Sequence, residues 1–213
     1  MTTRERSKLR APAPLAPLAK DAGRWGARTA HMRAIARYAA GLCTQGEVIA
    51  INSSRTTAAM AEFLTVPLTI LTNSFYLAHQ LLLLTESEVE LTAGTIYREL
   101  DLIHSPFAPD VPATRPICKL FTGACGVVPQ GVTEREPLRI HAAQRLQRKA
   151  HETIVLADSS RLAATGDLIM CSLSQIDRLI TDPEAADAVV QMLERAGVKV
   201  AAVQPDKRKF AYH

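Results

Sequence analysis

The chain has 213 residues, of which 47% are apolar, and its formal net charge is +4. This length suits one domain of ordinary size, with enough apolar residues to bury a core. Apolar runs of about eighteen uncharged residues are missing, and the start is basic and rich in proline, so neither a membrane span nor a secretion signal is supported. We therefore expect a globular, cytoplasmic protein.

The cysteines and histidines are scattered along the sequence. Cys43, Cys118, Cys125 and Cys171 form no Cys-x-x-Cys pair, which is typical of reduced, packed thiols. The six histidines also lack the spacing of metal ligands. We expect no bound metal and no cofactor.

The positive charge is concentrated near the amino terminus. Residues 1–37 hold nine Lys and Arg against two acids, while the rest of the chain carries sixteen bases against nineteen acids. Pro12, Pro14 and Pro17 forbid a regular helix or central strand, so residues 1–28 are predicted to be a linker or disordered arm. Such an arm could bind nucleic acid weakly through phosphates, or could serve only to keep the protein in solution.

Residues 29–213 form the predicted globular domain, in which helical patterns alternate with short apolar runs. In its first half we predict, in order, a helix over 29–42, a strand Val48–Ile51, a helix through Met60 and Leu64, a strand Leu68–Leu71, a helix over 75–84, a strand Val89–Leu91 and a strand Ile96–Ile103. Four prolines predict an irregular segment between Ser105 and Ile117.

The second half repeats the alternation. We predict a strand Lys119–Thr122, a loop through Gly131, a helix over 136–151, strands Thr153–Ala157, Ile169–Cys171 and Leu179–Thr181, a helix opened by Asp182 and Pro183 and closed by Gly197, and a strand Val198–Val203. On the 136–151 helix, Arg139, Arg145, Arg148 and Lys149 are interpreted as a solvated face. The whole pattern predicts an α/β fold with a mostly parallel sheet.

Small polar residues follow several of the predicted strands. Because the carboxyl ends of parallel strands meet at one edge of a sheet, we expect these corners to surround one small anion, most plausibly a phosphate. The alternative is that these Ser and Thr residues are ordinary helix N-caps. The candidate ligand-binding residues are Asn52, Ser53, Ser54, Arg55, Thr56, Thr57, Thr72, Asn73, Ser74, Gly94, Gly123, Asp158 and Arg161.

The order of these motifs resembles the effector-sensing domain of DeoR-type transcriptional repressors. The resemblance covers about residues 30–203 and depends on the segments Asn52–Thr57, Leu71–Ser74, Gly123–Val127 and Leu156–Arg161. It implies a three-layer αβα fold shared with ribose-5-phosphate isomerase, glucosamine-6-phosphate deaminase and CoA transferases. It also implies a phosphorylated sugar or related metabolite as ligand, self-association, and coupling to an amino-terminal helix-turn-helix that residues 1–28 are too short to form.

This sequence departs from the family pattern at the predicted pocket. Asn52 stands where the family has an acid, Ser54 where it has glycine, and Arg55 where it has a small hydroxyl residue. A serine at a glycine position resists positive φ, and Arg55 could either clamp a phosphate or fill the pocket. On the predicted helix 136–151, which precedes the strand ending in Asp158, Arg139 and Ala143 replace a Glu and a Lys of the family.

Three functions are compatible with these residues. The leading hypothesis is a regulatory domain that senses a sugar phosphate. The main alternative is an isomerase-like or deaminase-like enzyme on the same fold, with Glu134, Glu136 or Asp158 as the carboxylate base. A third possibility is a partner-binding module without a ligand, in which Arg55 or Tyr97 plugs the cavity.

Overall fold

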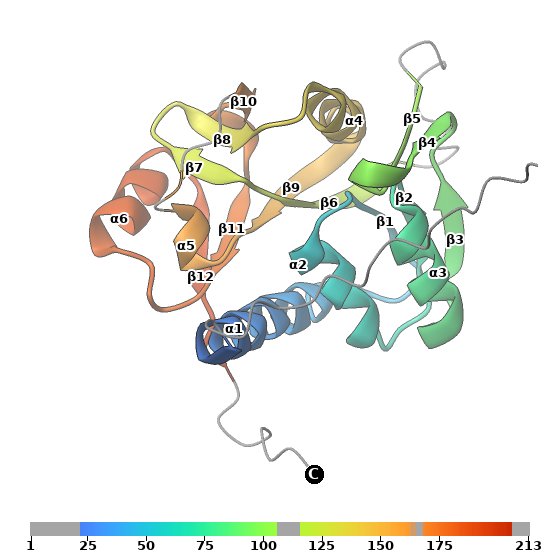
Figure 1. Ribbon diagram of the computed structural model, residues 1–213, viewed down its shortest axis with the longest axis horizontal. Helices are drawn as coiled ribbons and strands as arrows, with labels where there is room; N and C mark the ends of the chain where they lie inside the picture. Colours follow the sequence, from blue (N-terminus) through green and yellow to red (C-terminus); the bar gives the residue numbers. More distant parts are fainter. Residues whose placement is uncertain (1–21, 106–115, 163, 165–167, 206–213) are drawn as a thin grey trace, which may run out of the picture.

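The computed structural model describes residues 22–105, 116–162, 164 and 168–205. Its centre is a seven-stranded sheet in the order β12-β11-β9-β6-β1-β2-β3, and every neighbouring pair is parallel (Figure 1). The strands are β1 (Val48–Ile51), β2 (Thr69–Thr72), β3 (Glu88–Leu91), β6 (Ile117–Gly123), β9 (Ala150–Leu156), β11 (Arg178–Thr181) and β12 (Lys199–Ala202). The predicted α/β fold with a parallel sheet is therefore confirmed.

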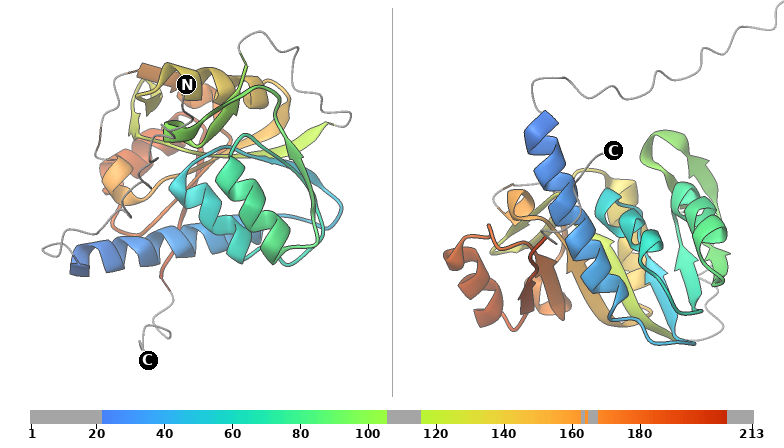
Figure 2. Two further views of the ribbon diagram at one scale, coloured as in Figure 1. Left: turned by 45° about the vertical axis from the view of Figure 1, so that its right-hand side comes forward. Right: turned by 90° about the horizontal axis from the view of Figure 1, so that it is seen from below.

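Helices cover both faces of the sheet. One face packs against α1 (Ala22–Ala40), α2 (Arg55–Ala58), the 3-10 helix η2 (Ala59–Glu62) and α3 (Phe75–Leu84). The other face packs against α4 (Pro137–Gln147) and α6 (Asp187–Arg195) (Figures 1 and 2). Short helical segments also occur at η3 (Arg98–Leu100), α5 (Ser159–Leu162) and η4 (Leu173–Gln175). Across the described residues, no helix combines the length and apolarity needed to cross a membrane.

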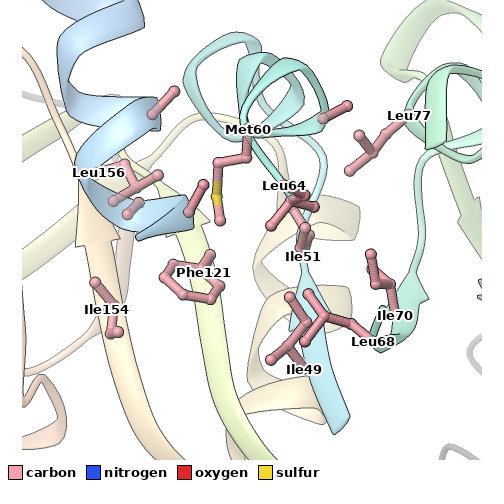
Figure 3. Close-up of a cluster of buried hydrophobic side chains, with 14 of the residues drawn as sticks. Ile49, Ile51, Met60, Leu64, Leu68, Ile70, Leu77, Phe121, Ile154 and Leu156 are labelled. Atoms are coloured by element: carbon pink, nitrogen blue, oxygen red, sulfur yellow. The ribbon is translucent and has the colours of Figure 1, made fainter. Parts of the chain in front are cut away.

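Alternation along the strands divides the core between the two faces. Ile49 and Ile51 point toward α1, where they join Met60 and Phe121, whereas Ala50 between them belongs to the cluster under α4 (Figure 3). Strands of a parallel sheet are covered on both faces, so both sets of side chains are apolar. This accounts for the uninterrupted apolar runs in the sequence.

Two smaller sheets were not predicted. The segment predicted as one strand, Ile96–Ile103, is instead a hairpin of β4 (Thr95–Tyr97) and β5 (Leu102–His104). Asp101 reverses the chain between them with a left-handed backbone at φ 45°. The predicted loop through Gly131 contains β8 (Gly131–Glu134), which pairs antiparallel with β7 (Gly126–Val128) and β10 (Leu168–Cys171).

Several predicted helix limits are wrong. The first helix begins at Ala22 instead of residue 29, and α4 ends at Gln147, so that β9 starts at Ala150. The helix predicted to open at Asp182 begins only at Asp187. The Asp182 carboxylate is fully buried and accepts the backbone N–H groups of Ser159, at 2.7 Å, and Glu184, at 3.0 Å, so it serves a tertiary contact. Residues 1–21 of the predicted arm and 106–115 of the predicted irregular segment lie outside the described residues.

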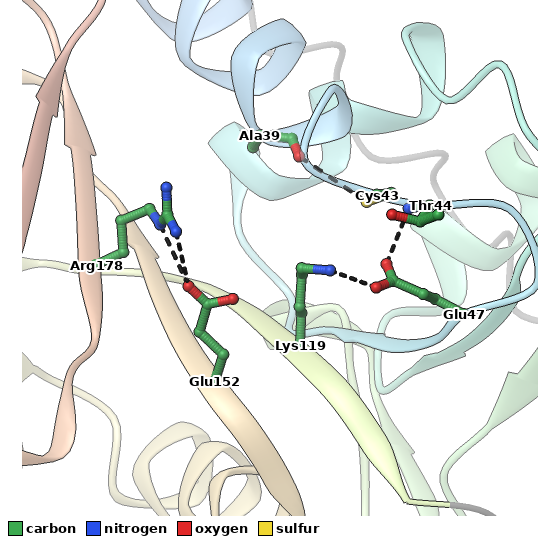
Figure 4. A network of polar contacts seen from close by, with 7 residues as sticks. All are labelled: Ala39, Cys43, Thr44, Glu47, Lys119, Glu152 and Arg178. Carbon is green, nitrogen blue, oxygen red and sulfur yellow. Dashed lines mark hydrogen bonds and ion pairs between the residues drawn. The ribbon is translucent and has the colours of Figure 1, made fainter.

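Ion pairs connect neighbouring strands at the amino edge of the sheet, which is the edge opposite the predicted ligand-binding residues. Lys119 on β6 donates to Glu47, just before β1, at 2.6 Å, and Arg178 on β11 pairs with Glu152 on β9 at 3.1 Å (Figure 4). Burial raises the pKa of the neighbouring Cys43 thiol to about 12. The thiol therefore stays protonated and behaves as a small packed side chain.

Candidate functional site

A pocket of about 370 Å³ lies where the polar corner that follows β1, residues 52–57, meets α3. We call this segment the first corner, or the Ser53 corner. Its volume falls within the range that small-molecule sites occupy, which is about 300–1,000 Å³. Four separate parts of the chain meet there: the segment from the end of β1 through η2, the helix α3, the turn at Asp101 and the helix α4. The lining residues are Ser53, Ser54, Arg55, Ala58, Ala59, Ala61, Glu62, Tyr76, Gln80, Leu84, Asp101 and Arg139.

A chain of amide hydrogen bonds holds the ends of β6, β1 and β2 together behind this pocket. The Asn52 side chain donates to the Thr122 hydroxyl at 2.9 Å and accepts from Asn73 at 2.6 Å. The Asn73 side-chain oxygen then accepts the backbone N–H of Ser53 at 2.8 Å. Asn52 and Asn73 are both buried, so their amides orient the Ser53 corner.

Ser54 caps α2 and packs against Gly123. Its hydroxyl accepts the Thr57 backbone N–H at 3.1 Å, while the Thr57 hydroxyl donates to the Asn52 carbonyl at 2.6 Å. The backbone at Ser54 is extended, with φ −160°, so the expected resistance to positive φ does not arise. A Cβ added to Gly123 would lie 2.6 Å from the Ser54 side chain. The glycine is required there because Ser54 fills that space.

The second predicted corner lies behind the pocket wall. Thr72, Asn73 and Ser74 are almost fully buried, and none of them lines the pocket. Ser74 caps α3 by accepting the Leu77 backbone N–H at 2.9 Å, and its hydroxyl donates to the Asp101 carboxylate. Asp101 also accepts the Tyr76 backbone N–H at 3.0 Å, so a carboxylate of the chain itself covers the amino end of α3.

Arg139 lines the pocket, although its place on the helix pattern predicts a solvated residue. It reaches from α4 to the first corner, donating to the Ser53 carbonyl at 2.9 Å and also to the Leu100 carbonyl. Its interpretation as part of a solvated face is wrong, and so is that of Arg145, which is buried and donates to the Ser105 carbonyl at 2.7 Å. Arg148 and Lys149 are exposed, as predicted. The signal that could have found Arg139 was its place at a Glu position of the resembling family.

The other predicted ligand residues are distributed around the carboxyl edge of the seven-stranded sheet. Among the candidates, only Ser53, Ser54 and Arg55 line the pocket, and Asn52, Thr56, Thr57 and Gly123 lie in or against the same corner. Gly94 is required by its own hairpin, since a Cβ there would fall 2.2 Å from the His104 carbonyl carbon. The corner of Asp158 and Arg161 is outside the pocket lining, and the Asp158 carboxylate accepts the Ser160 hydroxyl.

Two further groups of titratable side chains lie near this edge. The His104 and His141 rings share a hydrogen bond of 2.8 Å, and burial, followed by the charges of His141 and Arg145, lowers the pKa of His104. The Cys125 thiol donates to Glu134 at 3.1 Å, and burial together with this contact raises the pKa of Cys125. Neither group lines the pocket.

One trio has donor atoms close enough for a metal ion. The ligand atoms of His31, Asp182 and Glu184 lie within 4.8 Å of one another. Sequence spacing could not reveal this trio, because His31 is far from the two acids along the chain. The Asp182 carboxylate already accepts two backbone N–H groups, which accounts for its burial without an ion.

Comparison with known proteins decides the family. A family model described as the DeoR C terminal sensor domain matches residues 28–183. The chain belongs to this family. The sensor domain is 28% identical over 176 residues to the HTH-type transcriptional repressor GlcR of Bacillus subtilis, covering 82% of this chain and 68% of that protein. It is 31% identical over 178 residues to the uncharacterized HTH-type transcriptional regulator YulB of the same species, covering 83% and 69%.

A third relative and two solved structures extend the comparison. The HTH-type transcriptional regulator UlaR of Escherichia coli is 27% identical to the sensor domain over 79% of this chain and 67% of its own. The eIF2B beta protein from Chaetomium thermophilum shares the fold, with a TM-score of 0.50 and 12% identity over 84% of this chain and 57% of that one. Ribose-5-phosphate isomerase A from Methanocaldococcus jannaschii matches with a TM-score of 0.46 and 16% identity, over 62% and 53% of the two chains.

Proposed function

We propose that this sensor domain binds a phosphorylated sugar or a similar anionic metabolite in the pocket between the Ser53 corner and α3. We further infer that the bound ligand changes DNA binding or the oligomeric state of the regulator. The relatives are HTH-type regulators by name, and this chain spans about two thirds of their length.

The observation that carries this proposal is the environment of Arg139. Its guanidinium lies on the pocket wall, and its hydrogen-bond partners are two carbonyl oxygens and, at 3.5 Å, the Ser53 hydroxyl. These partners are dipoles without net charge, so the side chain keeps its full positive charge beside the pocket. An Arg fork of this kind suits bidentate binding of a phosphate.

The pocket wall also carries two acids, whose negative charges act against an anion. Glu62 pairs with Arg33, and Asp101 accepts hydrogen bonds from Ser74 and Tyr76, so each carboxylate already has partners inside the protein. Arg55 also lies on the wall, and its side chain is exposed to the pocket and to solvent. The hydroxyls of Ser53 and Ser54 complete a polar end, while Ala58, Ala59 and Leu84 supply an apolar wall for a carbon skeleton.

The two rival functions have less support in this pocket. Glu134, Glu136 and Asp158, the predicted bases of an enzyme, are outside its lining. The partner-binding module without a ligand requires Arg55 or Tyr97 to fill the cavity. A volume of about 370 Å³ remains with Arg55 on the wall, and Tyr97 does not line it. We therefore place sensing ahead of catalysis and of a ligand-free role.

Thermal unfolding with a panel of sugar phosphates tests this proposal. A ligand at a hundred times its dissociation constant should stabilise the domain by about 2.7 kcal/mol, which for this size raises Tm by about 5–10 °C. The unphosphorylated sugars and inorganic phosphate, each at the same concentration, show which part of the ligand is recognised.

A matched pair of variants, one in α4 and one just after it, locates the binding. Arg139→Gln should weaken binding at least tenfold, whereas Arg148→Gln, which removes an exposed charge from the same part of the chain, should leave it unchanged. The proposal fails if no phosphorylated metabolite shifts Tm, or if both variants bind as the unmodified chain does.

A further inference from the structure

The candidate pocket runs lengthwise between two helical segments. α2 and η2 follow each other without a break, and η2 packs beside α3 (Figure 2). The pocket-lining residues of the first segment include Arg55, Ala58, Ala59 and Glu62, and those of α3 are Tyr76, Gln80 and Leu84. Spacings of three, four and seven residues in the first set, and of four residues in the second, place each set on one face of its helix. The pocket therefore follows the length of both helical segments.

Both segments run in the same direction. β1 and β2 are parallel and each leads directly into its helix, so Arg55 and Tyr76 lie at the carboxyl edge of the sheet. Glu62 and Leu84 lie farther toward the amino edge. Tyr76 and Leu84 are eight residues apart on α3, a rise of about 12 Å. We call the end with Arg55 and Tyr76 the head end of the pocket, and the end with Glu62 and Leu84 the far end.

Arg139 lies at the head end. It donates to the carbonyl of the residue before Asp101, and Asp101 accepts the Tyr76 backbone N–H at 3.0 Å. Arg139 and Arg55 thus bring two cations to the head end, against the single carboxylate of Asp101. The charged residue at the far end of the lining is an acid, Glu62. Charge therefore favours a phosphate at the head end, with the rest of the ligand extending along α3.

The middle of the pocket suits a part of the ligand that carries hydroxyl groups. Ala58 and Ala59 are small, so they leave room beside α3. Gln80 lines the α3 side and is half-buried. Neither its side-chain amide nor the Tyr76 hydroxyl forms a hydrogen bond with another residue of the described ranges. A glutamine amide has two donor hydrogens and an acceptor oxygen, so Gln80 can both donate to and accept from the hydroxyls of a sugar.

We propose that the ligand lies along α3 with its phosphate at the head end and its sugar hydroxyls bound by Gln80, so that the domain selects phosphorylated sugars of hexose length over shorter phosphates. This inference rests on the function proposed above and names the length of its ligand and the residue that reads it. Gln80 is one helical turn, about 6 Å, beyond Tyr76. A short phosphate leaves Gln80 and the far end to water, whereas a hexose phosphate replaces that water with direct hydrogen bonds.

Isothermal titration of the unmodified chain with phosphates of different length is the first test. The probes are the 6-phosphates of glucose, fructose, mannose and galactose, together with ribose-5-phosphate and glycerol-3-phosphate. The best hexose phosphate should bind about tenfold or more tightly than glycerol-3-phosphate, with ribose-5-phosphate between them. A site that hydrogen-bonds a ligand hydroxyl discriminates against a ligand that lacks it, because the polar group of the site is then left without its partner.

Two variants separate the sugar part of the ligand from its phosphate. Gln80→Leu keeps a side chain of similar size and should weaken the best hexose phosphate about fivefold or more, while glycerol-3-phosphate changes by less than about twofold. Ala58→Leu narrows the middle of the pocket and should have the same selective effect, about tenfold or more on the hexose phosphate. Gln191→Leu, at an exposed amide on α6, is the matched control and should change neither affinity.

Arg139→Gln distinguishes this inference from the function on which it rests. It removes a cation from the head end, so it should weaken the hexose phosphate and glycerol-3-phosphate alike. Absence of binding by every probe would overturn the proposed function and this inference together. Binding that depends on Arg139 but is equal for long and short phosphates, or is weakened equally for both by Gln80→Leu, would overturn this inference alone. Circular dichroism of each variant without ligand verifies that it is folded.

Discussion

Arg33 of α1 forms an ion pair with Glu62, a residue on the pocket wall. Phe63 adds a cation–π contact, since its ring centroid lies 5.2 Å from the Arg33 guanidinium carbon and 5.0 Å from that of Arg37. The pocket is therefore in direct contact with the helix that leads toward the amino terminus of the chain. Because Glu62 is the acid at this junction, its charge opposes the entry of an anion.

Glu62→Gln should tighten the binding of an anionic ligand two- to fivefold, because it removes this repulsion. The stability of the domain should fall by less than about 1 kcal/mol, since both partners of the ion pair are about 40% exposed. Isothermal titration with the sugar phosphate that gives the largest thermal shift measures the affinity. Glu86→Gln, which changes an exposed acid just after α3, is the control, and weaker binding by Glu62→Gln would contradict the argument.

Asn73→Leu should destabilise the domain by about 2–4 kcal/mol. The substitution leaves the Ser53 N–H without its acceptor and the Asn52 side-chain oxygen without its donor, and both groups are buried. Urea unfolding measures the loss. Gln191→Leu changes an exposed amide on α6 and should shift stability by no more than about 0.5 kcal/mol. Equal effects of the two substitutions would show that the amide chain does not hold the corner.

Gly123→Ala should cost about 1–3 kcal/mol because its new methyl group would meet the Ser54 side chain at 2.6 Å. Combining it with Ser54→Gly should recover most of this loss, since the second change removes the atoms that clash. Replacing the Ser54 cap by glycine costs only a few tenths of a kcal/mol on its own. Thermal unfolding of the two single variants and the double variant gives the coupling, and strictly additive effects would count against the packing described.

The pKa of His104 implies a dependence of stability on pH. Burial first, and then the charges of His141 and Arg145, lowers this pKa from 6.5, so the unfolded chain binds a proton more readily than the folded one. Stability contributed by neutral His104 should be complete above about pH 6.5 and decrease as the pH falls below it. His104→Gln should flatten this decrease in urea unfolding between pH 7 and pH 5, whereas His79→Gln, at an exposed position, should not.

Much of the fold could be predicted because the decisive signals are local. The helix Phe75–Leu84 has the limits that its pattern and its Ser74 cap predict, and the apolar runs at Ile49, Ile70 and Ile154 are strands of one parallel sheet. Periodicity and capping depend on neighbours a few residues apart, so a single sequence carries them. The motif order was also sufficient to identify the family, which the comparison confirms.

Tertiary contacts decided the features that local patterns could not. Asp182 is a good helix cap by composition, but its carboxylate accepts the Ser159 N–H from another strand end, and the helix starts later. Arg139 has the pattern of a solvated residue, yet it spans from α4 to the Ser53 carbonyl and lies on the pocket wall. Both outcomes depend on groups far apart in the sequence that become neighbours only when the sheet assembles. The sequence alone therefore determined the strands of the main sheet and the family. The assembled sheet determined which polar groups are hydrogen-bonded within the protein and which face the pocket.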